Sequence, residues 1–184
     1  ISLWANATGL FGYKQATAKN VGYSYHAAGG VAGVDLRVAD NLVVGVMVGG
    51  ASGKVDYSAT GGNGSTDSVG GGVYAGYYGR HVFADASLVY GTNWLKSKRY
   101  IKFGTIDRVA RGKTTAGQLA GHGRVGYTAR VGKTVIEPSV GVQAVRVRQK
   151  GFTETGADDA NLTVDGRTDL SLRGTFSVRL AHIF

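Results

Sequence analysis

The sequence has no cysteine and only one proline among its 184 residues. Without cysteine, the chain can form neither a disulfide framework nor a thiolate metal site. No apolar run approaches the roughly 20 residues that a membrane-spanning helix requires, which excludes a helical membrane protein. No N-terminal stretch joins a basic start to an apolar middle and a small-residue cleavage site. We therefore expect a mature chain or an excised segment.

Glycine is abundant instead, with 31 residues. Glycine weakens helices and ordinary strands unless backbones must approach closely or bend. No segment has a sustained 3.6-residue period with helix caps, whereas alternating apolar and polar residues recur about every 20 residues. The sequence predicts one all-β domain over residues 1–184 with no helix. The eight expected strands are 3–13, 29–39, 42–57, 68–79, 82–95, 114–131, 134–149 and 167–184.

The segments between these strands alternate in length. Long connections are expected at 17–28, 58–67, 97–113 and 150–166, and short turns at 40–41, 80–81 and 132–133. Long connections on one rim and short turns on the other are typical of an up-and-down antiparallel meander. Both ends of the chain then lie at the short-turn rim.

Strand length separates a membrane barrel from a soluble β-sandwich. Alternation over four or five residues would fit a sandwich equally well. Here one face often stays apolar for about 9 to 11 residues, the length that a tilted strand needs to cross hydrocarbon. A bilayer offers no water to unpaired backbone groups, so strands there must close into a barrel without edges. The sequence therefore predicts a transmembrane antiparallel up-and-down β-barrel with eight strands in this chain.

The alternation also predicts what each face contacts. Apolar positions are expected to face lipid, and polar positions to line a wet lumen that accommodates charges of both signs. Aromatic residues near strand ends are expected to form interfacial girdles. The lipid-facing set is Leu119, Val125, Val140, Val142, Leu172 and Val178. The lumen-lining set is Asp35, Arg37, Asp85, His122, Arg124, Arg130, Glu137, Gln143, Arg173 and Arg179. The girdle set is Trp4, Tyr13, Tyr57, Tyr77, Tyr90, Trp94 and Phe184.

Three motifs raise alternatives that the sequence does not favour. The glycine-rich segment 60–68 could cradle phosphate, but it lacks the Lys-Ser/Thr ending and the following helix. The acidic segment 156–166 lacks EF-hand spacing, so we expect a solvated loop. The histidines lack ligand spacing, and Asp85, Ser87 and His122 are expected to share the lumen simply because polar residues gather there. We expect no catalytic residue, metal site or cofactor.

The basic stretch 93–113 interleaves Trp94, Tyr100 and Phe103 with lysine and arginine. The net charge of +9 allows nucleic acid, anionic lipid headgroups or a solvated surface as explanations. On an outer loop, the phosphates of lipopolysaccharide are favoured over nucleic acid. Inward folding of this loop as a plug remains a third interpretation.

Two stretches resemble the translocator (β-barrel) domain of Gram-negative bacterial autotransporters. The first covers residues 12–57, with Trp4 upstream and the hairpin GGVAGVDLRVADNLVVGV at 29–46. The second is the segment that begins with Gly151, Phe152, Glu154 and Gly156, followed by Leu162 and Val164. The likeness runs along nearly the whole chain. The family's barrel has about twelve strands, within the even-numbered range of outer-membrane barrels, so the eight strands expected here leave the last strands and the linker helix unaccounted for.

The resemblance implies an integral outer-membrane protein that anchors and exports an N-terminal passenger to the cell surface by type V secretion. Its implied partners are outer-membrane lipid and lipopolysaccharide, the barrel assembly machinery and the passenger itself, with no nucleic acid. Long loops would be extracellular and short turns periplasmic. One alternative is a plugged eight-stranded barrel with a structural or surface-interaction role, since eight strands enclose an interior that side chains fill. A third is a barrel-borne hydrolase.

Overall fold

The computed structural model describes residues 1–17, 20–58 and 61–182. The chain is almost entirely β-structure, as expected, with one 3-10 helix, η1 (Asp158–Ala160). Phe184 of the expected girdle and Thr60 of the glycine-rich motif lie outside the described residues. The strands are β1 (Ser2–Lys14), β2 (Tyr23–Ala39), β3 (Leu42–Tyr57), β4 (Asn63–Tyr78), β5 (Val82–Phe103), β6 (Ile106–Tyr127), β7 (Ala129–Val131), β8 (Thr134–Gln149), β9 (Phe152–Thr153), β10 (Thr163–Val164) and β11 (Arg167–His182).

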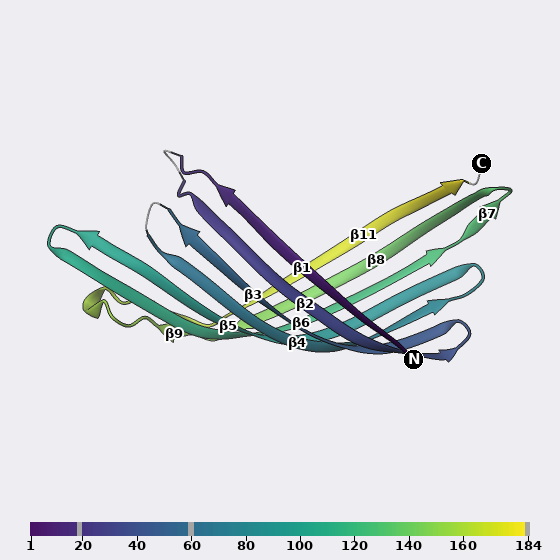
Figure 1. Ribbon diagram of the computed structural model, residues 1–184, viewed down its shortest axis with the longest axis horizontal. Coiled ribbons are helices and arrows are strands. Elements are labelled where there is room, and N and C mark those ends of the chain that lie inside the picture. Colours follow the sequence, from purple (N-terminus) through teal and green to yellow (C-terminus); the bar gives the residue numbers. More distant parts are fainter. Residues whose placement is uncertain (18–19, 59–60, 183–184) are drawn as a thin grey trace.

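Eight long strands form one antiparallel meander in the order β1-β2-β3-β4-β5-β6-β8-β11, and short β7 pairs with β8. β9 and β10 form a separate small hairpin. Figure 1 shows the strongly curved sheet, in which β1 and β11 cross in projection. The predicted meander and its eight strands are confirmed. In the described residues β1 pairs only with β2, and β11 only with β8, so these eight strands do not close on one another.

Several strands are longer than the apolar pattern predicted. The expected long connection at 97–113 is wrong, because β5 and β6 continue through it as a hairpin. Gly104 makes the tight turn between them with a φ of +55°, a conformation that side-chain-bearing residues rarely adopt. β5 and β6 continue through this polar stretch because the backbone hydrogen bonds between them do not require apolar side chains. Polar residues therefore mark where the apolar band ends, not where the strands end.

The two faces of the sheet follow directly from the pairing, because residues opposite each other in a ladder lie on the same face. We call the face that carries Asp35 and Asp85 the inner face and the opposite face the outer face. One inner row crosses the sheet through Asp35, Gly45, Tyr74, Ser87, His122, Gln143 and Arg173. The adjacent outer row contains Val34, Val46, Val73, Leu88, Gly121, Ala144 and Leu172.

The described residues form almost no hydrophobic core. The buried apolar residues are Ala110, Ala116 and Ala157, and no large side chain is fully buried. Outer-face side chains are exposed instead, as Val46 at 56% and Leu172 at 72% illustrate. In the described residues, no helix is both long and apolar enough to cross a bilayer.

Candidate functional site on the inner face

Trp4 joins the inner face rather than an aromatic girdle. Its indole Nε1 lies 2.6 Å from the Tyr74 hydroxyl and 3.2 Å from Asp35 Oδ1, and the Tyr74 hydroxyl donates to the same carboxylate. The girdle position expected for Trp4 is therefore wrong. Its place in the alternation, in phase with polar Asn6 and Thr8, is the signal that could have revealed this. Trp4, Asp35 and Tyr74 tie β1, β2 and β4 together near the short-turn rim.

Glycines make room for these inner aromatic rings. A Cβ placed on Gly33 would lie 2.5 Å from Cζ2 of Trp4, so the ring occupies the space that any side chain would take. Gly45 stands in the same relation to the ring of Tyr74. Flat packing of a ring on a neighbouring strand requires such a gap. This packing accounts for part of the high glycine content.

A second cluster joins β5 to β6. Arg124 donates from Nε and Nη2 to Asp85 Oδ1 at 2.8 and 2.6 Å, and His122 Nδ1 lies 3.4 Å from Asp85 Oδ2. Ser87 lies opposite His122 in the ladder, yet no hydrogen bond between them occurs in the described residues. Because Arg124 already neutralises the acid, the three do not form the relay that a serine nucleophile requires. The expectation that polar proximity here reflects a shared lumen fits this arrangement.

Further along the inner face, Glu137 of β8 bonds to β11 and to the residue between β6 and β7. Arg179 of β11 donates from Nη1 to Glu137 Oε2 at 3.0 Å, and Thr128 donates from Oγ1 to Oε1 at 3.1 Å. Inner-face charges thus hold neighbouring strands together in pairs of opposite sign. Such partly exposed pairs contribute modestly, about 0.2 to 1 kcal/mol each.

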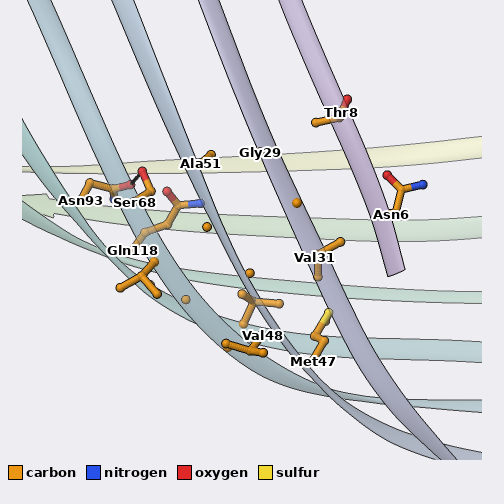
Figure 2. Close-up of a pocket in the computed structure, with 18 residues that line it drawn as sticks. Asn6, Thr8, Gly29, Val31, Met47, Val48, Ala51, Ser68, Asn93 and Gln118 are labelled. Atoms are coloured by element: carbon orange, nitrogen blue, oxygen red, sulfur yellow. Dashed lines mark hydrogen bonds between the residues drawn. The ribbon is translucent and has the colours of Figure 1, made fainter. Parts of the chain in front are cut away.

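Between β1 and β6, the middle of the inner face carries no charged residue around its cavity. A cavity of about 330 Å³ lies there, and its lining side chains are small, apolar or amide-bearing. Figure 2 shows it reaching from β1 to β6, with Ser68 donating to Asn93 Oδ1 at 2.6 Å. The inner residues around it include Asn6, Thr8, Val31, Met47, Ala51, Ser68, Asn93 and Gln118.

The connection from β8 to β11 packs on the far end of β6. Arg111 and Thr155 exchange both backbone hydrogen bonds, at 2.8 and 3.0 Å, and the Phe152 ring occupies the space above Gly112. Ala157 is completely buried, as is Ala110 of β6. Much of the acidic segment 156–166 is exposed to solvent, including Asp158, Asp159 and Asp165, although Asp158 and Asn161 also bond to protein partners. Figure 1 places the segment beside the tip of the β5–β6 hairpin.

Glu154 anchors this connection. Glu154 is buried, with only 7% of its surface exposed. Its carboxylate accepts a hydrogen bond from Arg99 Nη2 at 2.5 Å and another from the Leu162 amide at 3.0 Å. The Arg99 hydrogen bond holds the pKa of Glu154 below its ordinary value of 4.5, although burial opposes that change. Part of the family resemblance rests on Gly151, Phe152, Glu154 and Gly156. These residues thus all belong to the connection that packs on β6.

The ladder places the predicted residue sets on opposite faces. Asp35, Asp85, His122, Arg124, Glu137, Gln143, Arg173 and Arg179 lie on the inner face by register, as do Arg37 and Arg130 beside the irregular strand ends. In the described part of the chain, Arg37, Arg130 and Arg173 form no ion pair, unlike Arg124 and Arg179. The lipid-facing set lies on the outer face, with Leu119, Val125, Val140, Val142, Leu172 and Val178 all exposed.

Metal binding finds no support in the side-chain arrangement. Within the described residues, no group of three or more His, Asp or Glu side chains is close enough to hold a metal ion. The Asp85 and His122 pair is engaged by Arg124, which leaves no anionic ligand free there.

Comparison with solved structures shows where this fold occurs. The translocator domain of the autotransporter NalP from Neisseria meningitidis superposes with a TM-score of 0.78 at 16% identity, covering 97% of this chain and 60% of that one. The ferric yersiniabactin uptake receptor FyuA from Yersinia pestis gives a TM-score of 0.57 at 12% identity, covering 86% of this chain and 26% of that one. At these identities the likeness concerns the fold alone.

Sequence comparison identifies the family. Outer membrane protein A of Rickettsia conorii is 28% identical over 173 residues, covering 87% of this chain but only 8% of the relative's length. The family profile described as "Autotransporter beta-domain" matches residues 3–184. The chain therefore belongs to the autotransporter β-domain family.

Proposed function

We propose that this chain forms the membrane wall of a translocator that anchors and exports an N-terminal passenger to the cell surface. The observation that carries the proposal is an open, curved sheet whose exposed outer face is apolar and whose inner face is polar. In water, the apolar side chains of that outer face would stay exposed. The protein would then lack most of the stabilisation that burial of apolar surface gives a folded protein. In a bilayer it contacts hydrocarbon, while charges such as Asp85 and Arg124 remain hydrated inside. The proposed role is transport rather than catalysis.

Additional strands complete the barrel in this proposal. The outward edges of β1 and β11 have no partner in the described residues, and a bilayer gives exposed backbone groups none. A plugged barrel made of these eight strands alone would pair β1 with β11, which the sheet order does not contain. The whole chain, 1–184, then serves as most of the translocator's barrel domain. The wider barrel can enclose a hydrated passage, whereas eight strands leave space only for side chains.

The uncharged middle of the inner face suits passage of a polypeptide. Small and amide-bearing side chains there, such as Ser68 and Asn93, offer neither strong charge nor bulk that would hold a moving chain. Ion pairs lie on both sides of this stretch, with Asp85 and Arg124 toward the short-turn rim and Arg99 and Glu154 toward the long connections. We assign the short turns to the periplasm and the long connections to the exterior. Outer-membrane lipid, lipopolysaccharide, the barrel assembly machinery and the passenger are the proposed partners.

Two neighbouring residues of β3 provide the test. Met47 lies on the inner face, and Val46, 56% exposed, lies on the outer face. In the intact protein, Met47→Trp combined with Val31→Trp should slow the appearance of the passenger at the cell surface, because two indoles narrow the passage. Val46→Trp should leave export unchanged, because tryptophan is tolerated against lipid. Protease accessibility of the passenger in intact cells measures both, and equal export by all variants would overturn the proposal.

A further inference from the structure

A second cavity, of about 380 Å³, lies where the outer face of β5 and β6 meets the end of β8. Trp94 and Lys96 of β5 face Thr115 and Lys113 of β6 across the ladder. Lys150 completes the group, and its backbone amide donates to the Thr115 carbonyl at 3.0 Å. The full lining is Trp94, Leu95, Lys96, Lys113, Thr114, Thr115, Lys150 and Gly151, which includes three lysines and no acid.

The lysines of this cavity repel one another. Lys96 lies directly opposite Lys113, and the next outer pair, Lys98 and Arg111, again joins two cations. Like charges in directly opposed positions destabilise an antiparallel pair. In the part of the chain that the structure describes, Lys96, Lys113 and Lys150 form no ion pair. A ligand with negative charge would remove this repulsion.

Another lysine in the same row of the sheet is instead paired with an acid. Lys54 of β3 aligns with Ser65, which aligns in turn with Lys96. Lys54 is neutralised by Asp56, with Nζ and Oδ2 3.3 Å apart. Unbalanced positive charge is therefore a property of the β5, β6 and β8 side of this level. Arg146 and Arg148, on the outer face of β8, extend it further.

The cavity lies at the edge of the apolar band. Along the outer face of β5, Leu88 and Tyr90 are followed by Thr92 and Trp94, after which Lys96 and Lys98 begin. Tryptophan and tyrosine concentrate where hydrocarbon gives way to headgroups. The lysines therefore lie at the depth of the headgroup phosphates. Their compact ammonium groups suit a phosphate that carries several exposed oxygens.

We propose that this cavity binds a phosphate group of an outer-leaflet glycolipid headgroup. Lys96, Lys113 and Lys150 neutralise the phosphate, and the Trp94 indole lies against the sugar that carries it. This inference rests on the proposed function, because it needs the long connections to be on the exterior. It adds to that function a specific lipid contact that fixes the depth of the barrel.

The experiment compares two lipids that differ only in phosphate. The intact protein is reconstituted in zwitterionic nanodiscs and titrated with phosphorylated lipid A or with the same lipid after enzymatic dephosphorylation. Bound lipid is counted by native mass spectrometry. A triple variant, Lys96→Gln with Lys113→Gln and Lys150→Gln, should lose affinity for the phosphorylated form by about tenfold or more. The matched control Lys54→Gln should bind as the unaltered protein does.

Thermal unfolding supplies a second readout. Without phosphorylated lipid, the triple variant should be at least as stable as the unaltered protein, because repulsion between Lys96 and Lys113 is gone. With phosphorylated lipid, only the unaltered protein and the Lys54→Gln control should gain stability. The inference would be overturned if all variants preferred phosphorylated lipid equally, or if the Lys54→Gln control lost as much affinity as the triple variant. It would also be overturned if inorganic phosphate stabilised the protein as much as phosphorylated lipid does. Export of the passenger is scored in parallel, so intact export without phosphate preference refutes the lipid site and leaves the proposed function standing.

Discussion

Two adjacent rows of side chains cross the same strands on opposite faces of the sheet, and one row is largely polar whereas the other is apolar. The inner row contains Asp35, Tyr74, His122 and Arg173, whereas the outer row, one residue away on each strand, contains only apolar residues and glycine. Some inner charges occur in pairs of opposite sign, such as Asp85 with Arg124. Outer side chains such as Val46 and Leu172 are instead exposed. The difference indicates two solvents separated by a single layer of backbone.

The largest effect should come from placing a charge on the outer face. Val140→Arg in the intact protein should cost about 2 to 4 kcal/mol of folding free energy in a bilayer, because the guanidinium would lie in hydrocarbon. Gln143→Arg, on the inner face of the same strand, should be tolerated. Urea unfolding in lipid vesicles measures both. Equal damage from the two variants would mean that the faces are misassigned.

Filling the gap beneath an inner ring should have a smaller effect. Gly33→Val would bring a side chain to within 2.5 Å of Trp4 Cζ2, forcing the indole away from Asp35 and Tyr74. We expect a loss of about 1 to 3 kcal/mol, the usual cost of overpacking. Gly123→Val is the control, because a Cβ there meets nothing within 4 Å and points to the outer face. If both substitutions cost the same in vesicle unfolding, ring packing is not the reason for Gly33.

The smallest effect should come from Glu154, where an ion pair holds the β8–β11 connection on β6. Glu154→Gln should weaken that packing by about 1 kcal/mol, because the bond from Arg99 loses its charge assistance. The pKa of Glu154 is lowered in the folded protein, so its stabilisation is present above 4.5 and is lost as pH falls through the lowered pKa.

Hydrogen–deuterium exchange of residues 150–166 at decreasing pH, corrected for intrinsic rates, checks this prediction. The unaltered connection should open progressively in the acid range, and the Glu154→Gln variant should lack that component. Asp165→Asn in the same connection is the control and should retain the full pH response, since Asp165 is exposed and Arg99 pairs with Glu154 instead. An unchanged response in Glu154→Gln would assign the acid sensitivity to other groups.

Local alternation was enough to assign the faces of the strands. Val140 and Gln143 lie on opposite faces for the reason that a period of two imposes on any strand. The prediction failed where nearness to a strand end was given more weight than the phase of the alternation. Trp4 was placed at the lipid interface because it lies near a strand end, yet Asp35 and Tyr74 draw it inward. The hairpin beyond Lys96 was missed because its ladder continues through polar residues.

The sequence by itself determined the β-class, the number of long strands and the side to which each residue points, because all three follow from local periodicity and turn residues. Only the tertiary structure decided which charges pair, how the β8–β11 connection packs against β6, and that β1 and β11 remain separate edges. These features join residues far apart in the chain. Their positions depend on the curvature and register of the whole sheet, which no single segment specifies.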